Sequence, residues 1–135
     1  MVQATLVPTQ ENPVTEESPT LPINLYGRSK LMSEWIIQDY GLASNFRYVI
    51  LRYFNVAGSD SKGRIGSNLR NKHHLIANAC NVALNSEPEL KIFGTDFPTI
   101  DGTGVRDYIH VEDLAGSNVD ALKYLENHGK SQILN

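Results

Sequence analysis

Tyr26 and Lys30 are the residues whose types and spacing could support proton transfer in this chain. On a helix, residues four positions apart lie one turn apart on the same face. A phenol ordinarily has a pKa of about 10, and a nearby ammonium lowers it by favouring the phenolate. Tyr26 would then serve as a general acid or base, with Lys30 as its electrostatic partner. Taken alone, the spacing favours a simpler interpretation, a half-buried tyrosine beside a solvated lysine.

The element that must position this pair is predicted to be an amphipathic helix. Apolar side chains recur close to a 3.6-residue period at Leu25, Leu31, Met32, Trp35, Ile36, Ile37 and Tyr40. Gly41 follows them and is expected to end the helix. Prolines at positions 8, 13, 19 and 22 predict an extended loop before it.

The residues after this helix predict a parallel sheet. Residues 46–54 are aromatic and β-branched, which is typical of a strand, and the apolar middle Val49–Leu51 favours a strand covered on both faces. A helix, a glycine and then a strand form the second half of a βαβ unit. The predicted fold class is therefore α/β, with part of a doubly wound parallel sheet.

Further elements follow along the chain. A second amphipathic helix is predicted at 73–84 and a short edge strand at 90–93. A third helix is predicted from Glu112 or Asp113 to Asn127, with Asp113 as its cap and an apolar stripe at Leu114, Val119, Leu122 and Leu125. Residues 131–134 predict the start of another strand. Residues 55–72 and 94–105 are expected to be loops; Gly63-x-x-Gly66 lacks the residues that complete a phosphate-binding motif.

Composition excludes several classes of function. The 135 residues suffice for one domain with its own core, and 41% hydrophobic with 20% charged residues is typical of a soluble globular protein. A net charge of -3 argues against a nucleic-acid surface, and no apolar run predicts a membrane span or a signal peptide. Cys80 is the only cysteine, so no disulfide can form within the chain, which indicates a reducing, cytoplasmic setting. Its side chain is predicted to be a small, buried hydrophobic group. The histidines match no zinc spacing, so no metal site is predicted.

Four features occur in order and together carry a resemblance. They are the Tyr26-x-x-x-Lys30 pair, the run LRYFNVAG at 51–58, the run IFGTDFPTIDGTG at 92–104 and the run VRDYIHVEDLA at 105–115. The chain closely resembles the UDP-glucose 4-epimerases of the extended short-chain dehydrogenase/reductase superfamily, over nearly all of its length from Pro8. The first two features recur across the superfamily. The long run around Gly102–Val111 is more particular to the 4-epimerases.

The resemblance implies a role for eleven residues. Tyr26 would be the catalytic base, Lys30 would hold the nicotinamide ribose, and Phe54 would lie against the nicotinamide. A substrate site would be formed by residues that contact the diphosphate, sugar or uracil: Asn55, His74, Leu75, Ile76, Lys91, Ile92, Phe93 and Arg106. His74 departs from the Asn-Leu-Met that the family often has there. Arg106 suits a diphosphate, since a planar guanidinium can donate two parallel hydrogen bonds to phosphate.

The implied activity is the interconversion of UDP-glucose and UDP-galactose. Tyr26 would take the proton of the sugar 4-hydroxyl while tightly bound NAD accepts hydride from C4, and the 4-keto sugar would turn over before hydride returns. The resemblance also implies a cytoplasmic homodimer that binds a UDP-sugar, with neither nucleic acid nor membrane as a partner.

The family's glycine-rich Gly-x-x-Gly-x-x-Gly turn, where the NAD pyrophosphate sits, is missing from this sequence. Its Ser/Thr-rich strand end is missing or altered: Val2–Leu6 stands in its place, and Thr5 is not assigned as a substitute. We therefore expect an internal portion of an epimerase, residues 1–135 forming one partial NAD-dependent epimerase/dehydratase domain. Residues 1–58 would be the second half of the Rossmann-like part, and 59–135 the substrate-binding loops and helices.

Two alternatives to this interpretation stay open. The first is another NAD-dependent nucleotide-sugar enzyme, a 4,6-dehydratase or a decarboxylase, which the length of the 102–111 run disfavours. The second is a non-catalytic remnant that binds a nucleotide sugar or a partner chain carrying the missing half. The sequence preceding this segment would discriminate between them.

Overall fold

The structure is a computed structural model that describes residues 2–3, 14–66 and 74–135. Thr5 and His73, which the sequence analysis singled out, lie outside the described residues. The elements are β1 (Val2–Gln3), α1 (Leu25–Ala43), β2 (Val49–Tyr53), β3 (Asn55–Ala57), α2 (Leu75–Ala83), β4 (Tyr108–His110), α3 (Val111–Glu126) and β5 (Gln132–Leu134).

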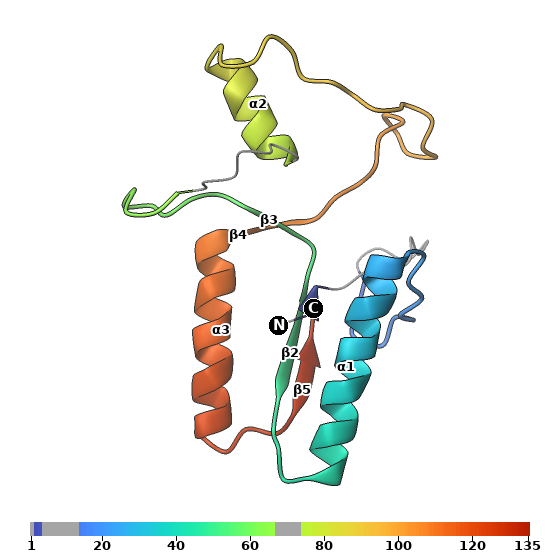
Figure 1. The fold of residues 1–135 in the computed structure, drawn as a ribbon, viewed down its shortest axis with the longest axis vertical. Coiled ribbons are helices and arrows are strands. Elements are labelled where there is room, and N and C mark those ends of the chain that lie inside the picture. Colours follow the sequence, from blue (N-terminus) through green and yellow to red (C-terminus); the bar gives the residue numbers. More distant parts are fainter. Residues whose placement is uncertain (1, 4–13, 67–73) are drawn as a thin grey trace.

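Parallel strands form the centre of the fold. β1, β2 and β5 pair in that order, and Ile50 in the middle of β2 lies opposite Ile133 of β5. Figure 1 shows α1 and α3 flanking these strands on opposite sides, so β2 is covered on both faces as its apolar middle predicted. The α/β prediction is confirmed, and β5, from the predicted substrate-binding part, pairs with β2 in the same sheet.

Two features of helix α1 depend on its neighbours. The side chain of Asn24 caps the helix by accepting a hydrogen bond from the Gly27 backbone N–H at 2.8 Å. The sequence predicted that the helix would end at Gly41, but it continues to Ala43. A Cβ at position 41 would lie 2.7 Å from Cε1 of Tyr48, so this glycine provides room for a packed ring.

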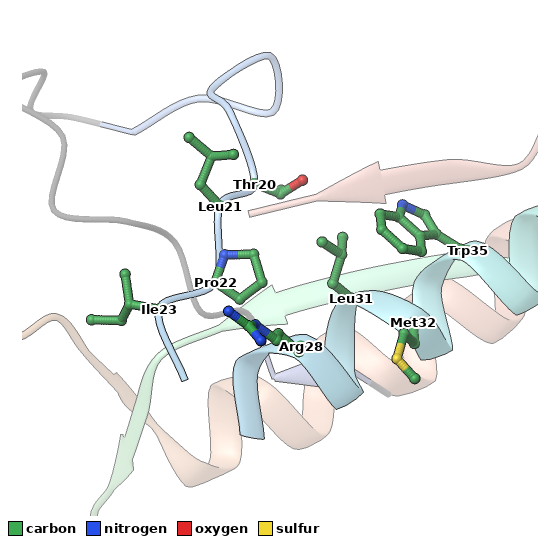
Figure 2. A pocket seen from close by; sticks show the side chains of 8 residues that line it. All are labelled: Thr20, Leu21, Pro22, Ile23, Arg28, Leu31, Met32 and Trp35. Atoms are coloured by element: carbon green, nitrogen blue, oxygen red, sulfur yellow. The ribbon is translucent and has the colours of Figure 1, made fainter. Parts of the chain in front are cut away.

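The apolar stripe of α1 faces solvent. Its buried residues are Gly27 and Glu34, whereas Trp35 is 55% and Ile36 is 68% exposed. The predicted helix is confirmed, but most of its apolar stripe is uncovered in this chain, with Leu31 and Ile37 half-buried. Figure 2 shows part of the exposed stripe forming the wall of an open groove of about 660 Å³ with the preceding extended segment; the lining residues are Thr20, Leu21, Pro22, Ile23, Arg28, Leu31, Met32 and Trp35.

The hydrophobic core of the described part is small. Only Ile50 of β2 and Leu114 of α3 are buried apolar side chains there. Val119 and Leu122, predicted to complete the apolar stripe of α3, are 52% and 58% exposed. Length alone predicted a domain with its own core, but the described residues leave most of their large apolar side chains uncovered.

Several shorter predictions are wrong in detail. Residues 55–57, expected in a loop, form β3, and residues 90–93 form no strand. Asp113 does not cap α3, because the cap is His110, whose Nδ1 accepts from the Glu112 N–H at 3.2 Å. Cys80 is exposed on α2 rather than buried. The predicted strand at 131–134 is confirmed as β5.

Within residues 2–3, 14–66 and 74–135, no helix combines enough length and apolar character to cross a membrane.

Candidate active site

Tyr26 and Lys30 lie in the first two turns of α1, as their spacing predicted. Tyr26 is 50% exposed, and the Lys30 ammonium lies 5.2 Å from the centroid of its ring. An ammonium over an aromatic face is a favourable cation–π arrangement. Lys30 is thus placed beside the ring of the half-exposed Tyr26.

The carboxyl end of β2 leads directly into the second predicted cluster. Phe54 follows β2, and Asn55 opens β3, whose parallel partner is β4. Both the backbone N–H and the side-chain amide of Asn55 donate to the carbonyl oxygen of Asp107, at 3.2 and 3.1 Å. Asn55 is thereby fixed beside the residue that follows Arg106, although 52 positions separate Asn55 from Asp107.

Arg106 stands between an ordered turn and β4. Its exposed guanidinium donates from Nη1 to the carbonyl oxygen of Val105 at a long 3.4 Å. The preceding turn is held by the Asp101 carboxylate, which accepts from the backbone N–H and the hydroxyl of Thr103, both at 2.9 Å. These hydrogen bonds hold the pKa of Asp101 below its ordinary value.

The remaining predicted substrate residues lie apart from this cluster. Figure 1 shows α2, which carries Leu75 and Ile76, projecting beyond β3 and β4 on the side away from the main sheet. His74 precedes α2, and its side chain makes no capping hydrogen bond. Lys91, Ile92 and Phe93 lie in the following extended segment, where Ile92 is 68% and Phe93 is 89% exposed. Asn55 thus lies beside the residue that follows Arg106, whereas residues 74–76 and 91–93 lie elsewhere; the roles of all these residues stay predictions.

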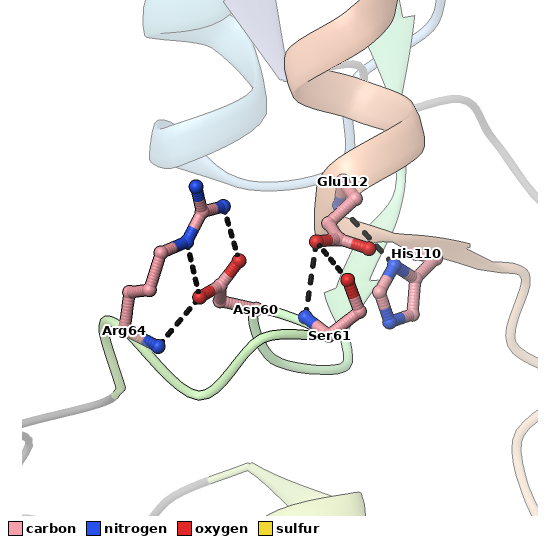
Figure 3. A network of polar contacts seen from close by, with 5 residues as sticks. All are labelled: Asp60, Ser61, Arg64, His110 and Glu112. Carbon is pink, nitrogen blue, oxygen red and sulfur yellow. Dashed lines mark hydrogen bonds and ion pairs between the residues drawn. The ribbon is translucent and has the colours of Figure 1, made fainter.

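A polar network that the sequence analysis missed joins the loop after β3 to the start of α3. Figure 3 shows its two halves. Asp60 accepts from the Arg64 backbone and guanidinium at 2.6 to 3.0 Å, and Ser61 donates from its N–H and hydroxyl to Glu112 at 3.0 and 2.9 Å. Asp60 and Arg64 are four positions apart, but nothing local to Ser61 indicates a partner 51 positions away.

The Asp60–Arg64 pair predicts a measurable titration. The Arg64 guanidinium, followed by its backbone N–H, lowers the pKa of Asp60 from 3.8 to about 2. Because the pKa is lowered in the folded chain, the stabilisation is complete above the ordinary value and is lost as the pH falls through about 2. We expect the Asp60 carboxyl carbon to titrate near pH 2 by NMR, and Arg64→Met to move that midpoint upward. A midpoint near 3.8 in the unmodified chain would contradict the pairing.

Comparison with known proteins decides the family. Residues 4–135 match the NAD dependent epimerase/dehydratase family. This chain belongs to that family. The resemblance inferred from the motif runs is therefore confirmed, and so is the prediction of an NAD-dependent enzyme class.

Individual relatives agree with this membership. The chain is 53% identical over 123 residues to a UDP-glucose 4-epimerase of Azospirillum brasilense, covering 91% of this chain and 35% of that protein. A Brucella ovis UDP-glucose 4-epimerase in complex with NAD superposes with a TM-score of 0.86 at 42% identity, covering 96% of this chain and 39% of that one. A Bifidobacterium longum UDP-glucose 4-epimerase in complex with NAD+ and UDP superposes with a TM-score of 0.85 at 38% identity. This match covers 98% of this chain and 40% of that one. The chain spans about a third of the length of the curated relatives it matches.

The described residues fit one end of a dinucleotide. A half-exposed phenol and an ammonium can contact ribose hydroxyls, and Phe54 follows β2 at its carboxyl end, where ligands bind in open α/β sheets. The helix starts in the described part, at Asn24, His74 and His110, carry no glycine-rich turn that would receive a pyrophosphate. Tyr26, Lys30 and Phe54 are therefore the residues that would hold the nicotinamide end of NAD.

Proposed function

We propose that this chain supplies the catalytic Tyr–Lys pair and part of the nucleotide-sugar site of a UDP-glucose 4-epimerase, which interconverts UDP-glucose and UDP-galactose. The observation that carries the proposal is the geometry of α1: an exposed phenol with an ammonium 5.2 Å from its ring, in a chain of the NAD dependent epimerase/dehydratase family. The 53% identity to an Azospirillum brasilense enzyme of that name supports the choice of reaction.

The proposed acid–base chemistry rests on Tyr26 and Lys30. The Tyr26 oxygen accepts the proton of the sugar 4-hydroxyl and later returns a proton to the same position. The Lys30 ammonium favours the phenolate through its charge. NAD, when bound, supplies the oxidation and re-reduction of the sugar C4.

The proposed substrate contacts come from the β3–β4 pair. Asn55 is held by two hydrogen bonds to the Asp107 carbonyl, and the exposed guanidinium of Arg106 has donors to spare for a diphosphate. Leu75, Ile76, Ile92 and Phe93 would cover the nucleoside, together with His74 and Lys91, once a ligand or further protein orders that open side. The UDP in the Bifidobacterium longum complex supports a UDP-sugar as the substrate class.

The proposed function can be tested by a segment graft. The matching 123-residue segment of the Azospirillum brasilense UDP-glucose 4-epimerase is replaced by the corresponding residues of this chain, and conversion of UDP-galactose is followed in a coupled assay. We expect a folded, NAD-containing protein that interconverts the two sugars. A folded graft that binds NAD but only dehydrates the sugar, or leaves UDP-galactose unchanged, would contradict the epimerase assignment.

Arg106→Ala in this graft is expected to weaken UDP binding by about 1.5–3 kcal/mol, which is the range for a hydrogen bond to a charged group. Calorimetric titration of UDP measures the change. Arg47→Ala serves as the matched control, because the Arg47 guanidinium donates to the Gly129 carbonyl near the opposite end of β2. An unchanged affinity in Arg106→Ala would remove this residue from the diphosphate site.

A further inference from the structure

A charged pair lies buried between α1 and β2. The Arg52 side chain is 6% exposed and the Glu34 side chain 3%, and they are the buried charged residues of the described chain. Arg52 Nε donates to Oε1 and Oε2 of Glu34 at 3.0 and 3.2 Å, and its Nη2 donates to Oε2 at 2.7 Å. Arg52 lies within the LRYFNVAG run at 51–58, but neither Arg52 nor Glu34 is among the residues proposed to contact cofactor or substrate.

Stability alone is a poor explanation for such a pair. Removing two charges from water costs several kcal/mol for each ion, so a buried ion pair is often no better than well-packed apolar residues. This pair also leaves Nη1 of Arg52 buried without a hydrogen-bond partner. Unlike apolar packing, its hydrogen bonds are directional. A guanidinium and a carboxylate that share several hydrogen bonds therefore tolerate little sliding or rotation of one element against the other.

Helix α1 needs a directional contact to fix its position on the sheet. Gly27 is the other buried residue of this helix, and the apolar stripe that ordinarily fixes a helix on a sheet faces solvent. Burial of apolar area is non-directional, and little of it occurs on the inner face of α1. The buried ion pair is consequently well suited to set the position of α1 along β2.

The spacing on both elements connects this anchor to the active site. Figure 1 shows α1 and β2 running in opposite directions, so the start of α1 lies at the same end as the end of β2. Tyr26 is eight residues before Glu34, which is about 12 Å along a helix. Asn55 is three residues after Arg52, which is about 10 Å along a strand. An anchor at Glu34–Arg52 therefore brings the Tyr26 turn level with Phe54 and Asn55.

We propose that Glu34 and Arg52 are positioning residues that fix the height and rotation of α1 on β2 and so hold Tyr26 and Lys30 at the carboxyl end of that strand. The inference rests on the proposed function for its catalytic meaning, but the geometry stands independently of it. A slip of one helical turn would move Tyr26 by about 5.4 Å. A misplacement of about 1 Å can already lower a rate about 100-fold.

The test measures geometry in the segment graft, whose other cysteines are replaced by alanine. A nitroxide is attached at Asp39→Cys, an exposed position of α1, in a Cys80→Ala background, and paramagnetic relaxation is measured at the amides of β2. The pair is replaced by the apolar pair Glu34→Leu with Arg52→Met, and separately by Arg52→Lys. Asp120→Asn, which breaks the exposed Lys123–Asp120 pair, is the matched control.

We expect the apolar double variant to unfold at a similar temperature but to show relaxation rates at Ile50–Tyr53 that change several-fold, because the effect depends on the inverse sixth power of distance. Arg52→Lys keeps the positive charge but loses the planar set of guanidinium donors, so it should give an intermediate change in these relaxation rates. Asp120→Asn should leave the profile unchanged. An unaltered relaxation profile in the folded double variant or in folded Arg52→Lys would overturn the positioning role. The readout is the distance between α1 and β2 and not turnover, so failure of this test is distinguishable from failure of the proposed function.

Discussion

Tyr26→Phe in the segment graft is expected to lower epimerase turnover at least about 100-fold, the usual loss when a general acid–base residue is removed. The substitution removes one oxygen from a side chain that is 50% exposed, so the free energy of unfolding should change little. The interconversion of UDP-glucose and UDP-galactose is measured at saturating substrate, with thermal unfolding measured in parallel.

Tyr40→Phe is the matched control for this variant. Tyr40 lies on the same helix and is 59% exposed, and its ring packs edge-on against Phe46 with centroids 5.3 Å apart. Phenylalanine preserves that ring contact, so Tyr40→Phe should retain full turnover. Full turnover in Tyr26→Phe as well would refute the assignment of Tyr26 as the acid–base residue, whatever the family.

The 135-residue chain by itself is expected to show no epimerase turnover and no stable NAD binding. In a doubly wound fold, most of the dinucleotide crevice is built by a glycine-rich first βαβ half, and this sequence holds no such turn. Tyr26 and Lys30 would then have no positioned nicotinamide. NAD titration by calorimetry and the coupled sugar assay measure both effects, with the segment graft as the active comparison.

The same chain is expected to self-associate or aggregate. Ile50 and Leu114 are its only buried apolar side chains in the described part, while Trp35, Ile36 and Phe93 are more than half exposed. Large exposed apolar patches are sites of association with protein or of aggregation. Light scattering during purification measures this. A monodisperse monomer that turns over UDP-galactose with only added NAD would show that the site is more complete than the structure indicates.

Local patterns in the sequence predicted the Tyr26–Lys30 pair and indicated the family. The four-residue spacing of Tyr26 and Lys30 places both on one helical face because the helical repeat is a local property of the backbone. The strands β2 and β5 were predicted from short runs of β-branched and aromatic residues for the same reason. The long run through Gly102 and Val111 indicated the epimerases before any contact was known.

Tertiary structure decided what those elements face. The periodicity of α1 showed an apolar stripe but not what covers it, and in this chain the buried positions are Gly27 and Glu34. A glycine such as Gly41 often ends a helix, but here its lack of a side chain makes room for the Tyr48 ring packed beside it. Burial depends on neighbours distant in sequence, which a local pattern cannot specify.

Long-range pairing decided the geometry of the site. Asn55 meets Asp107, Ser61 meets Glu112, and Glu34 meets Arg52 only because the chain folds β3 against β4 and α1 against β2. Such contacts depend on loop closure and on the register of the strands, and the spacing of residues along the sequence predicts neither of these. The sequence by itself determined which side chains could do the chemistry, and the tertiary structure determined which of them stand together.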